Sequence, residues 1–461
     1  MTFNSTNQTI VHSQPNHVYI ETYGCQMNFS DSEVINAILL QEGYSLTPNV
    51  NNADFILINT CAIRDNAEQR IRKRLHDLKA LQRQHHVRIG ILGCMAERLQ
   101  KQLLEEEENV SFVVGPDAYR KLPTILLQSI HGDKTAETTL SEEETYADII
   151  PVRINGNGIS GYISIMRGCQ NYCSYCVVPY TRGKERSRDP RTIVEEAQML
   201  FDQGYREVTL LGQNVNSYKW IGNIDRGMST IGFPQLIALV ADISPLLRVR
   251  FATSHPKDLS DELLQVMSEH SNICRCIHLP VQSGSARILK LMNRHYTPDW
   301  YLNRIDAIRH YLPDCSITTD VIAGFCSETE DDHQATLAMF RKVRYDYAYM
   351  FKFSMRPNTY AERHMQDDIP EDIKIRRLEE IIALQGEIAL ENNRRDIGKT
   401  YEVLTEGTSH RSKEQLFGRN SQNKVIVFDH GNHHAGEYLH VRVTDCTAAT
   451  LKGVVVNSSK D

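Results

Sequence analysis

The chain has 461 residues, of which 41% are hydrophobic and 24% charged, and its formal net charge is −7 at pH 7. This composition excludes wholesale disorder, and the length predicts about three domains at roughly 150 residues each. The negative net charge excludes a protein that binds nucleic acid by its total charge. No stretch has the ~18 consecutive apolar residues of a membrane helix, and the first residues show no signal-peptide pattern. We therefore expect a cytoplasmic protein without membrane contact. Its eleven cysteines are expected to stay reduced.

The first part of the chain predicts three consecutive strand-loop-helix units. They are YIETYGCQMNFSDSEVINAILLQEGY, with a helix start near Ser30 or Asp31, then ADFILINTCAIRDNAEQRIRKRLHDLKALQRQ, and then VRIGILGCMAERLQKQLLEEE. Such units in succession are typical of a parallel α/β domain, which we place at residues 16–131. Residues 132–153 are polar and acidic without an apolar period, and we predict a linker there.

Each of the three loops begins with a cysteine: Cys25, Cys61 and Cys94. Loops that follow parallel strands gather at the carboxyl edge of the sheet, so we expect these cysteines to converge. A buried cysteine taken alone is commonly a small core residue. The same offset in three successive units favours a shared role instead.

Strand and helix patterns alternate again over residues 154–391. The predicted strands are GYISIM, REVTLLG, RVRFAT, CIHLPV, SITTDVIAGF and YAYMFKFS. Six β/α units predict a parallel partial (β/α)6 barrel, whose active site lies at the carboxyl ends of the strands. Polar residues gather there and are candidate cofactor-binding residues: Gln213, Asn214, Ser254, His255, His278, Gln282 and Asp320.

Residues 392–457 carry short β-like runs separated by Gly, Asn and Asp, namely TYEVLTEG, LFGRN, NKVIVFDH, EYLHVRVTD and ATLKGVVV. This pattern predicts a small antiparallel β-barrel. Barrels of this kind often bind RNA, and an inert appendage is the alternative explanation. The whole chain is therefore expected to be of the α/β class with a terminal β-barrel.

The segment RGCQNYCSYCVVPYTRG contains Cys169, Cys173 and Cys176 in a C-x3-C-x2-C spacing. A structural zinc site normally completes its tetrahedron with a fourth protein ligand. The next histidine, His255, and the next cysteine, Cys274, are distant in sequence. If this trio holds a metal, one coordination position is left for another ligand.

This motif, with Tyr175 before its last cysteine, resembles that of the radical S-adenosylmethionine superfamily. Further segments resemble the methylthiotransferases of that superfamily: YGCQMNFSDSE, INTCAIRDNA, LGCMAER, VVPYTRGKERSR, LLGQNVNSY, ATSHP, HLPVQSGS and TDVIAGF. The resemblance covers about residues 16–457 and implies the order methylthiotransferase domain, radical barrel, TRAM domain. One departure is SMRPNTYAE, in which Asn358 and Tyr360 stand where the family more often has Gly and Pro.

The resemblance also implies cofactors and a reaction. Cys169, Cys173 and Cys176 would hold a [4Fe-4S] cluster whose open iron is chelated by S-adenosylmethionine (SAM). Cys25, Cys61 and Cys94 would hold a second [4Fe-4S] cluster, which carries the sulfur to be inserted. One SAM would donate a methyl group to that sulfur, and another would yield the 5′-deoxyadenosyl radical that removes hydrogen from carbon 2 of the isopentenylated adenosine at position 37 of tRNA.

Within the family, the segment GCQMN followed by FSDSE resembles that of enzymes that modify isopentenyladenosine. The forms GCKVN and GCPKN are more typical of enzymes that modify threonylcarbamoyl-adenosine or an aspartate of a ribosomal protein. The resemblance implies two partners, namely the anticodon stem-loop of tRNA and an electron donor such as flavodoxin or ferredoxin. The enzyme itself is expected to be a monomer. An iron–sulfur electron carrier or cluster-delivery protein, and a zinc-dependent RNA-binding protein, are the alternatives.

Local charge supports an RNA partner. Between Arg64 and Arg88 there are eight Arg or Lys residues against three acids. Phosphate neutralisation requires a local basic patch and not a positive total charge. A solvated amphipathic face is the alternative explanation for this helix.

Overall fold

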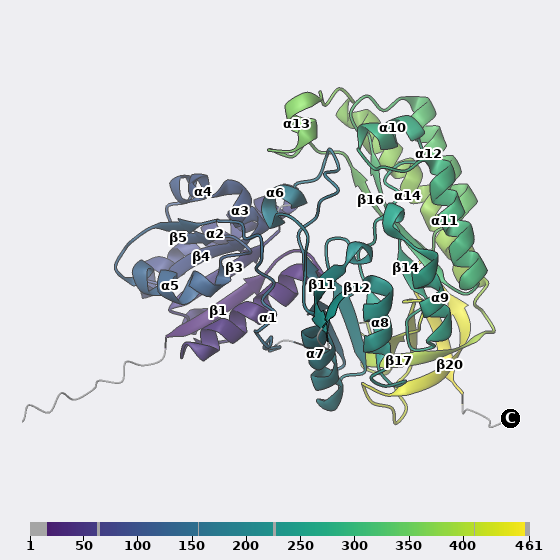
Figure 1. Cartoon of the computed structure of the whole chain (residues 1–461), viewed down its shortest axis with the longest axis horizontal. Helices are drawn as coiled ribbons and strands as arrows, with labels where there is room; N and C mark the ends of the chain where they lie inside the picture. Colours follow the sequence, from purple (N-terminus) through teal and green to yellow (C-terminus); the bar gives the residue numbers. More distant parts are fainter. Residues whose placement is uncertain (1–15, 62–64, 155, 225–226, 410, 457–461) are drawn as a thin grey trace, which may run out of the picture. The chain divides into compact units, whose positions relative to one another are not determined.

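The chain folds into two units, residues 1–140 and 141–461, of which the computed structural model describes residues 16–61, 65–154, 156–224, 227–409 and 411–456 (Figure 1). The first unit contains a sheet of six strands in the order β2-β1-β3-β4-β5-β6, and every pairing is parallel. Its strands are β1 (His17–Thr22), β2 (Ser45–Leu46), β3 (Phe55–Thr60), β4 (Arg88–Gly93), β5 (Val110–Val114) and β6 (Thr135–Glu137). Its helices are α1 (Gln26–Gln41), α2 (Asp65–His85), α3 (Cys94–Leu99), α4 (Lys101–Glu106) and α5 (Leu122–Ile130). The predicted parallel α/β fold is confirmed.

The central strand β3 shows why this sheet forms. It reads FILINT, and all of its residues are buried. A parallel strand with both faces covered by other elements is a nearly continuous apolar run and not an alternating one. On one face Ile56 and Ile58 join Ile71 and Leu75 of α2 in a single apolar cluster.

Two local predictions for this unit are wrong. Helix α1 begins at Gln26, with Cys25 at its N-cap, so Ser30 and Asp31 lie inside the helix and are buried. Strand β6 lies within the segment predicted to be a linker, and it pairs with β5 from Phe112 to Val114. The three residues of β6 extend the sheet through backbone hydrogen bonds, which carry no periodic sequence signal.

Glu97 of α3 is a buried carboxyl group at the edge of this sheet. Burial, together with the nearby carboxyl groups of Asp117 and Glu137, raises its pKa to about 8. A Cβ added at Gly115 would lie 1.9 Å from Glu97 Oε2, so the strand end leaves this carboxyl little space. The fold therefore favours the protonated form of Glu97 over the carboxylate.

We expect the stability of the first unit to depend on pH through Glu97. A carboxyl group with a raised pKa in the folded state contributes stability that is fully present below its ordinary pKa, near 4.5, and is lost as pH rises through about 8. The measurement is the pH dependence of the unfolding temperature of the whole protein, compared with that of Glu97→Gln. The slope between these pH values should be smaller in the variant, and equal slopes would contradict the assignment.

The second unit contains a parallel partial barrel. Three strands form the order β13-β10-β7, three form β14-β15-β16, and a parallel bridge between Val249 and Ile273 joins the two groups. These strands are β7 (Ser160–Ser164), β10 (Glu207–Leu211), β13 (Arg248–Phe251), β14 (Cys276–His278), β15 (Ser316–Ala323) and β16 (Tyr347–Lys352). All six predicted barrel strands are therefore present.

The second unit contains further helices, and the longer ones lie along the outside of the barrel strands (Figure 1). They are α6 (Val178–Arg182), α7 (Pro190–Asp202), α8 (Phe233–Ala241), α9 (Asp261–Glu269), α10 (Ala286–Leu291), α11 (Pro298–Tyr311), α12 (Glu330–Val343), α13 (Tyr360–His364) and α14 (Glu371–Arg394). Two short antiparallel pairs are added, β8 (Met166–Arg167) with β9 (Arg186–Ser187) and β11 (Lys219–Ile224) with β12 (Gly227–Gly232). Within the described ranges no helix combines the length and the apolar composition needed to cross a membrane.

Strand β15 shows how the barrel separates its two faces. Ile317 and Val321 are buried in the apolar cluster that the outer helices share. Thr318 and Asp320 alternate with them and are only half-buried. Because successive strand residues point to opposite faces, this alternation places polar side chains on the inner face of the barrel.

The C-terminal residues form a closed five-stranded barrel in the order β17-β18-β19-β21-β20. The strands are β17 (Thr400–Thr408), β18 (Gln415–Arg419), β19 (Val425–Asp429), β20 (Tyr438–Cys446) and β21 (Leu451–Val455). Four pairings are antiparallel, and the β19–β21 pairing is parallel. The predicted small β-barrel is confirmed, with one parallel pairing that the strand pattern does not indicate.

Two buried arginines of β13 attach this small barrel to the larger one. Arg248 donates to the carbonyl oxygens of Arg419 and Glu402 at 2.7 and 3.0 Å, and Arg250 donates to the carbonyl oxygen of Asn420 at 2.8 Å. Arg250 also binds Glu207 at 2.7 Å. Arg248 and Glu207 are the first residues of their strands, so the small barrel covers the amino-terminal end of the larger barrel. The two barrels thus pack together within the second unit.

Candidate active site

The loop after β8 presents the trio Cys169, Cys173 and Cys176. Gly168, which precedes it, has φ +80°, and a Cβ there would lie 1.9 Å from the carbonyl oxygen of Lys184. Only glycine allows this close approach of two backbone segments. The amide of Cys176 donates to the carbonyl oxygen of Cys173 at 2.9 Å, which closes a turn between the last two cysteines.

A buried guanidinium group lies against this trio. Arg294 donates to Cys173 Sγ at 3.3 Å, to the hydroxyl of Tyr175 at 3.5 Å and to the carbonyl oxygen of Pro280 at 2.9 Å. A buried cation stabilises negative charge on nearby sulfur because the low local dielectric strengthens the attraction. Arg294 is therefore suited to an anionic group bound by the cysteines.

The thiols themselves fit a metal cluster. Burial raises the pKa of the Cys169 thiol to about 11 and that of the Cys176 thiol to about 12. Thiolates in such an environment require positive charge close by, which iron ions supply when they are coordinated. The sequence places no fourth Cys or His in this loop, so a cluster held by these three thiolates would keep one iron without a protein ligand.

Arg294→Met is expected to lower the reduction potential of a cluster held by this trio. The variant loses a buried positive charge and the hydrogen bond to Cys173, and both stabilise the reduced cluster. A tenfold change in the one-electron reduction equilibrium would lower the potential by on the order of 60 mV. The measurement is an EPR-monitored redox titration of the reconstituted protein. Arg304→Met, on the outer helix α11, is the matched control. An unchanged potential at unchanged iron content would show that Arg294 only supports the fold.

The predicted residues after β10 and β13 are brought together. Asn214 Oδ1 accepts from the amide of His255 at 2.9 Å, and Asn214 Nδ2 donates to Asp258 at 2.7 Å. The hydroxyl of Ser254 donates to Asn216 Oδ1 at 3.3 Å. The side-chain amide of Asn214 therefore joins the two loops, since both its oxygen and its nitrogen form hydrogen bonds within the protein.

His255 and Gln213 carry polar atoms suited to a ligand. His255 Nδ1 accepts from the amide of Lys257 at 3.3 Å, so Nε2 carries the proton of the neutral ring. Burial lowers the pKa of His255 to about 2, with Arg294 contributing, so the ring is neutral at physiological pH. Among the described residues, buried His255 Nε2 and Gln213 Oε1 have no hydrogen-bond partner. Buried polar atoms are rarely left unpaired, so these two favour a polar ligand at the barrel mouth.

The other predicted residues form a second group on β14, on β15 and in the segment after β14. His278 Nε2 lies 3.4 Å from Asp320 Oδ1, and His278 Nδ1 lies 2.9 Å from Thr318 Oγ1. Gln282 has φ +65° and donates its amide to the carbonyl oxygen of Asp320 at 2.9 Å. A left-handed backbone in a residue other than glycine is costly and is often found at functional sites. The alternation along β15 places Asp320, with its partner His278, on the inner face of the barrel.

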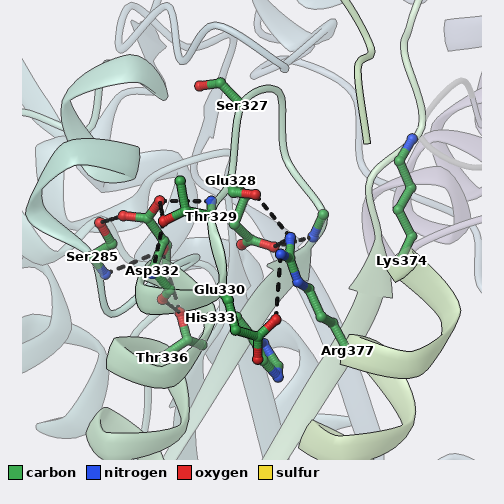
Figure 2. Close-up of polar contacts among 12 residues, drawn as sticks. Ser285, Ser327, Glu328, Thr329, Glu330, Asp332, His333, Thr336, Lys374 and Arg377 are labelled. Atoms are coloured by element: carbon green, nitrogen blue, oxygen red, sulfur yellow. Dashed lines mark hydrogen bonds and ion pairs between the residues drawn. The ribbon is translucent and has the colours of Figure 1, made fainter. Parts of the chain in front are cut away.

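The loop that follows β15 is held by a buried ion pair (Figure 2). Glu328 accepts from the amide of Gly324 at 2.7 Å and from Arg377 of α14 at 3.0 Å. Asp332 accepts from the amide of Thr329 at 2.8 Å and so caps α12. The sequence reasoning missed Glu328, Arg377 and Arg294, because a charged side chain gives no local sign that it will be buried against a distant partner.

In the first unit, Cys25, Cys61 and Cys94 follow the adjacent strands β1, β3 and β4. A Cβ added at Gly24 would lie 2.6 Å from Cys61 Cβ, so the first two loops touch. Gly93 has φ +85°, and a Cβ there would lie 2.6 Å from the carbonyl oxygen of Thr60. Glycine before Cys25 and before Cys94 thus lets both loops approach the end of β3, where Cys61 lies.

Two buried asparagines fix this edge of the sheet. Cys25 Sγ donates to Asn28 Oδ1 at 3.3 Å, and Asn28 Nδ2 donates to the carbonyl oxygen of Thr60 at 2.8 Å. Asn59 Nδ2 donates to the carbonyl oxygen of Asn28 at 2.8 Å and to Ser32 Oγ at 3.0 Å. These hydrogen bonds position Cys25 relative to the end of β3, next to Cys61.

Helix α2 is less basic at its surface than its sequence indicates, although Arg64 lies outside the described residues. Arg72 forms ion pairs with Glu68, Glu106 and Glu107, and Arg74 pairs with Glu21. Exposed positions of the helix include Arg70, Lys73, His76, Arg83 and His85. The predicted phosphate contact therefore rests on fewer cations than the composition gives.

Three family models match successive parts of the chain. The uncharacterized protein family UPF0004 matches residues 17–115, the radical SAM superfamily matches residues 163–340, and the TRAM domain matches residues 394–456. The three matched ranges correspond to the parallel sheet unit, the partial barrel and the small β-barrel.

Curated relatives resemble the chain over nearly its whole length. A protein of Phocaeicola vulgatus is 55% identical over 96% of both chains, and one of Bacteroides fragilis is 54% identical over 96% of both. One of Porphyromonas gingivalis is 51% identical over 96% of both. Each bears the name tRNA-2-methylthio-N(6)-dimethylallyladenosine synthase.

Solved structures show the same fold at low identity. The radical S-adenosylmethionine methyltransferase TsrM of Kitasatospora setae, with cobalamin and a [4Fe-4S] cluster bound, has a TM-score of 0.57 and 13% identity. The match covers 76% of this chain and 77% of that chain. The same enzyme with tryptophan and a SAM analogue bound has a TM-score of 0.56 and 13% identity over 75% of both chains.

Proposed function

The chain belongs to the tRNA-2-methylthio-N(6)-dimethylallyladenosine synthase family, and from this we infer that it converts N6-isopentenyladenosine at position 37 of tRNA to its 2-methylthio derivative. The observation that carries this inference is identity above 50% over 96% of the chain, together with the cysteine trio at the mouth of a radical SAM barrel. Membership of the radical SAM superfamily brings an iron–sulfur cluster and SAM as cofactors.

Cys169, Cys173 and Cys176 would hold the cluster that binds SAM. When bound, this cluster supplies the electron that cleaves SAM to methionine and a 5′-deoxyadenosyl radical. Arg294 would stabilise the negative charge of the thiolate ligands. Gln213 Oε1 and the neutral His255 Nε2 would bind polar groups of SAM, since both are buried and have no partner among the described residues.

The remaining predicted residues fall into two roles. Asn214 and Ser254 would position the loops that carry Gln213 and His255. His278, Gln282 and Asp320 would line the inner face of the barrel and bind SAM or orient the substrate adenosine.

We propose a second [4Fe-4S] cluster on Cys25, Cys61 and Cys94. Three adjacent loops that each present one cysteine, with glycines that permit close approach, support this ligand set. Its open iron would carry the sulfur that one SAM methylates. The asparagine network at Cys25 would hold the first ligand in place before the cluster is assembled.

The proposed partners follow from the reaction. The substrate is the anticodon stem-loop of a tRNA that carries isopentenyladenosine, an electron donor such as flavodoxin or ferredoxin reduces the cluster, and the enzyme acts as a monomer. Exposed cations on α2 and the TRAM barrel would contact the RNA backbone.

Mass spectrometry of tRNA nucleosides from cells with and without this protein tests the function. We expect the methylthio group to be lost from isopentenyladenosine and kept on threonylcarbamoyl-adenosine. Loss from the latter alone would identify the sister activity. If the anaerobically reduced protein cleaved no SAM, an iron–sulfur carrier would be the better explanation.

A further inference from the structure

Exposed tyrosines surround the loop that carries the cysteines of the radical site. Tyr172 lies within that loop and is 48% exposed, Tyr180 of α6 is 37% exposed, and Tyr360 of α13 is 51% exposed. The rings of Tyr172 and Tyr180 meet edge to face, with centroids 6.5 Å apart. Large aromatic rings left in solvent side by side are typical of a binding surface.

A cation and two further rings extend this surface onto α13. The guanidinium group of Arg363 lies 5.7 Å from the centroid of the Tyr180 ring. One turn away, the rings of Tyr360 and His364 stack with centroids 4.4 Å apart and planes at 39°. Ring contacts thus join Tyr172, Tyr180 and Arg363, and Tyr360 and His364 lie on the same short helix as Arg363. These five side chains are called the ring platform below.

The ring platform is attached rigidly to the cysteine loop. The amide of Ala361 donates to the carbonyl oxygen of Ser174 at 2.8 Å, and Ser174 lies between Cys173 and Cys176. Thr359 caps α13 by accepting from the amide of Glu362 at 3.2 Å. Asn358, which stands where the family more often has Gly, adopts φ +68°, a conformation that asparagine tolerates. Binding to a preformed surface costs little conformational entropy.

We propose that the ring platform binds unpaired nucleobases that flank the modified adenosine, a role that rests on the proposed function. Sequence-specific recognition of RNA uses loop bases that are splayed out and stacked on aromatic rings or on Arg. Every base has a π-face, so exposed rings beside an Arg fit a single-stranded RNA loop. The platform adjoins the loop that would hold the radical-generating cluster, which is where the target adenosine must be delivered.

Fluorescence of a labelled RNA tests this proposal. An isopentenylated anticodon stem-loop carrying 2-aminopurine next to the modified position is titrated with the reconstituted full-length enzyme. With Tyr360→Ala we expect the quenching of 2-aminopurine to disappear and Kd to rise about tenfold, because stacking of one base is lost. Tyr360→Phe keeps the ring and should stay within about twofold of the unaltered protein. Leu239→Ala, an exposed apolar residue of α8, is the surface control.

The outcomes separate this proposal from the function itself. Unchanged quenching and Kd in both Tyr360→Ala and Tyr180→Ala, with unchanged iron content and unfolding temperature, would overturn the ring platform while the enzyme still methylthiolates tRNA. Slower reduction by flavodoxin with unchanged RNA binding would also overturn it and would identify a docking site for a protein donor. A protein that never methylthiolates tRNA would refute the proposed function instead.

Discussion

Replacing Cys61 by alanine is expected to abolish the methylthio product while cleavage of SAM continues. Cys61 is buried at the end of β3, between the loops of Cys25 and Cys94, and no other cysteine of this edge can replace it. The cysteines of the radical site lie in the other unit of the chain and are not altered by this change. Iron should fall from roughly eight ions per chain to about four, since a cubane contains four.

The measurement combines liquid chromatography of 5′-deoxyadenosine with mass spectrometry of the tRNA nucleosides. Cys446→Ala, a half-buried cysteine of the small barrel, is the matched control and should keep both activities. Normal sulfur insertion by Cys61→Ala would show that Cys25, Cys61 and Cys94 do not bind the second cluster.

Cys176→Ala is expected to abolish both the cleavage of SAM and the methylthio product. Cys176 closes the turn with Cys173 and is one of the three proposed cluster ligands. Two remaining cysteines would not hold the cluster that binds SAM. Roughly four iron ions should remain if the first-unit cluster assembles independently. Only Cys176→Ala is therefore expected to stop SAM cleavage, whereas both single variants should lose the methylthio product.

The second measurement uses the same two products and adds the EPR signal of the reduced protein. Cys326→Ala, a buried cysteine near the loop after β15, controls for the loss of a packed thiol. SAM cleavage that persists in Cys176→Ala would place the radical chemistry at another site.

The sequence by itself determined the fold class, and it identified both cysteine trios as candidate cluster ligands. Apolar runs such as FILINT, and the alternation of strands with helices, are local patterns set by periodic burial, and the parallel sheet and the six barrel strands confirm them. The C-x3-C-x2-C spacing is likewise local. The shared offset of Cys25, Cys61 and Cys94 was enough to predict that they converge.

Only the tertiary structure decided what surrounds those cysteines. Arg294 reaches Cys173 across 121 residues, and Arg250 reaches Asn420 across 170 residues, so neither contact leaves a periodic trace in the sequence. The strand β6 and the parallel β19–β21 pairing depend on backbone hydrogen bonds, which any side chain permits. Local burial patterns specify elements, whereas buried charges and rings acquire their partners only when distant segments of the chain come together in the fold.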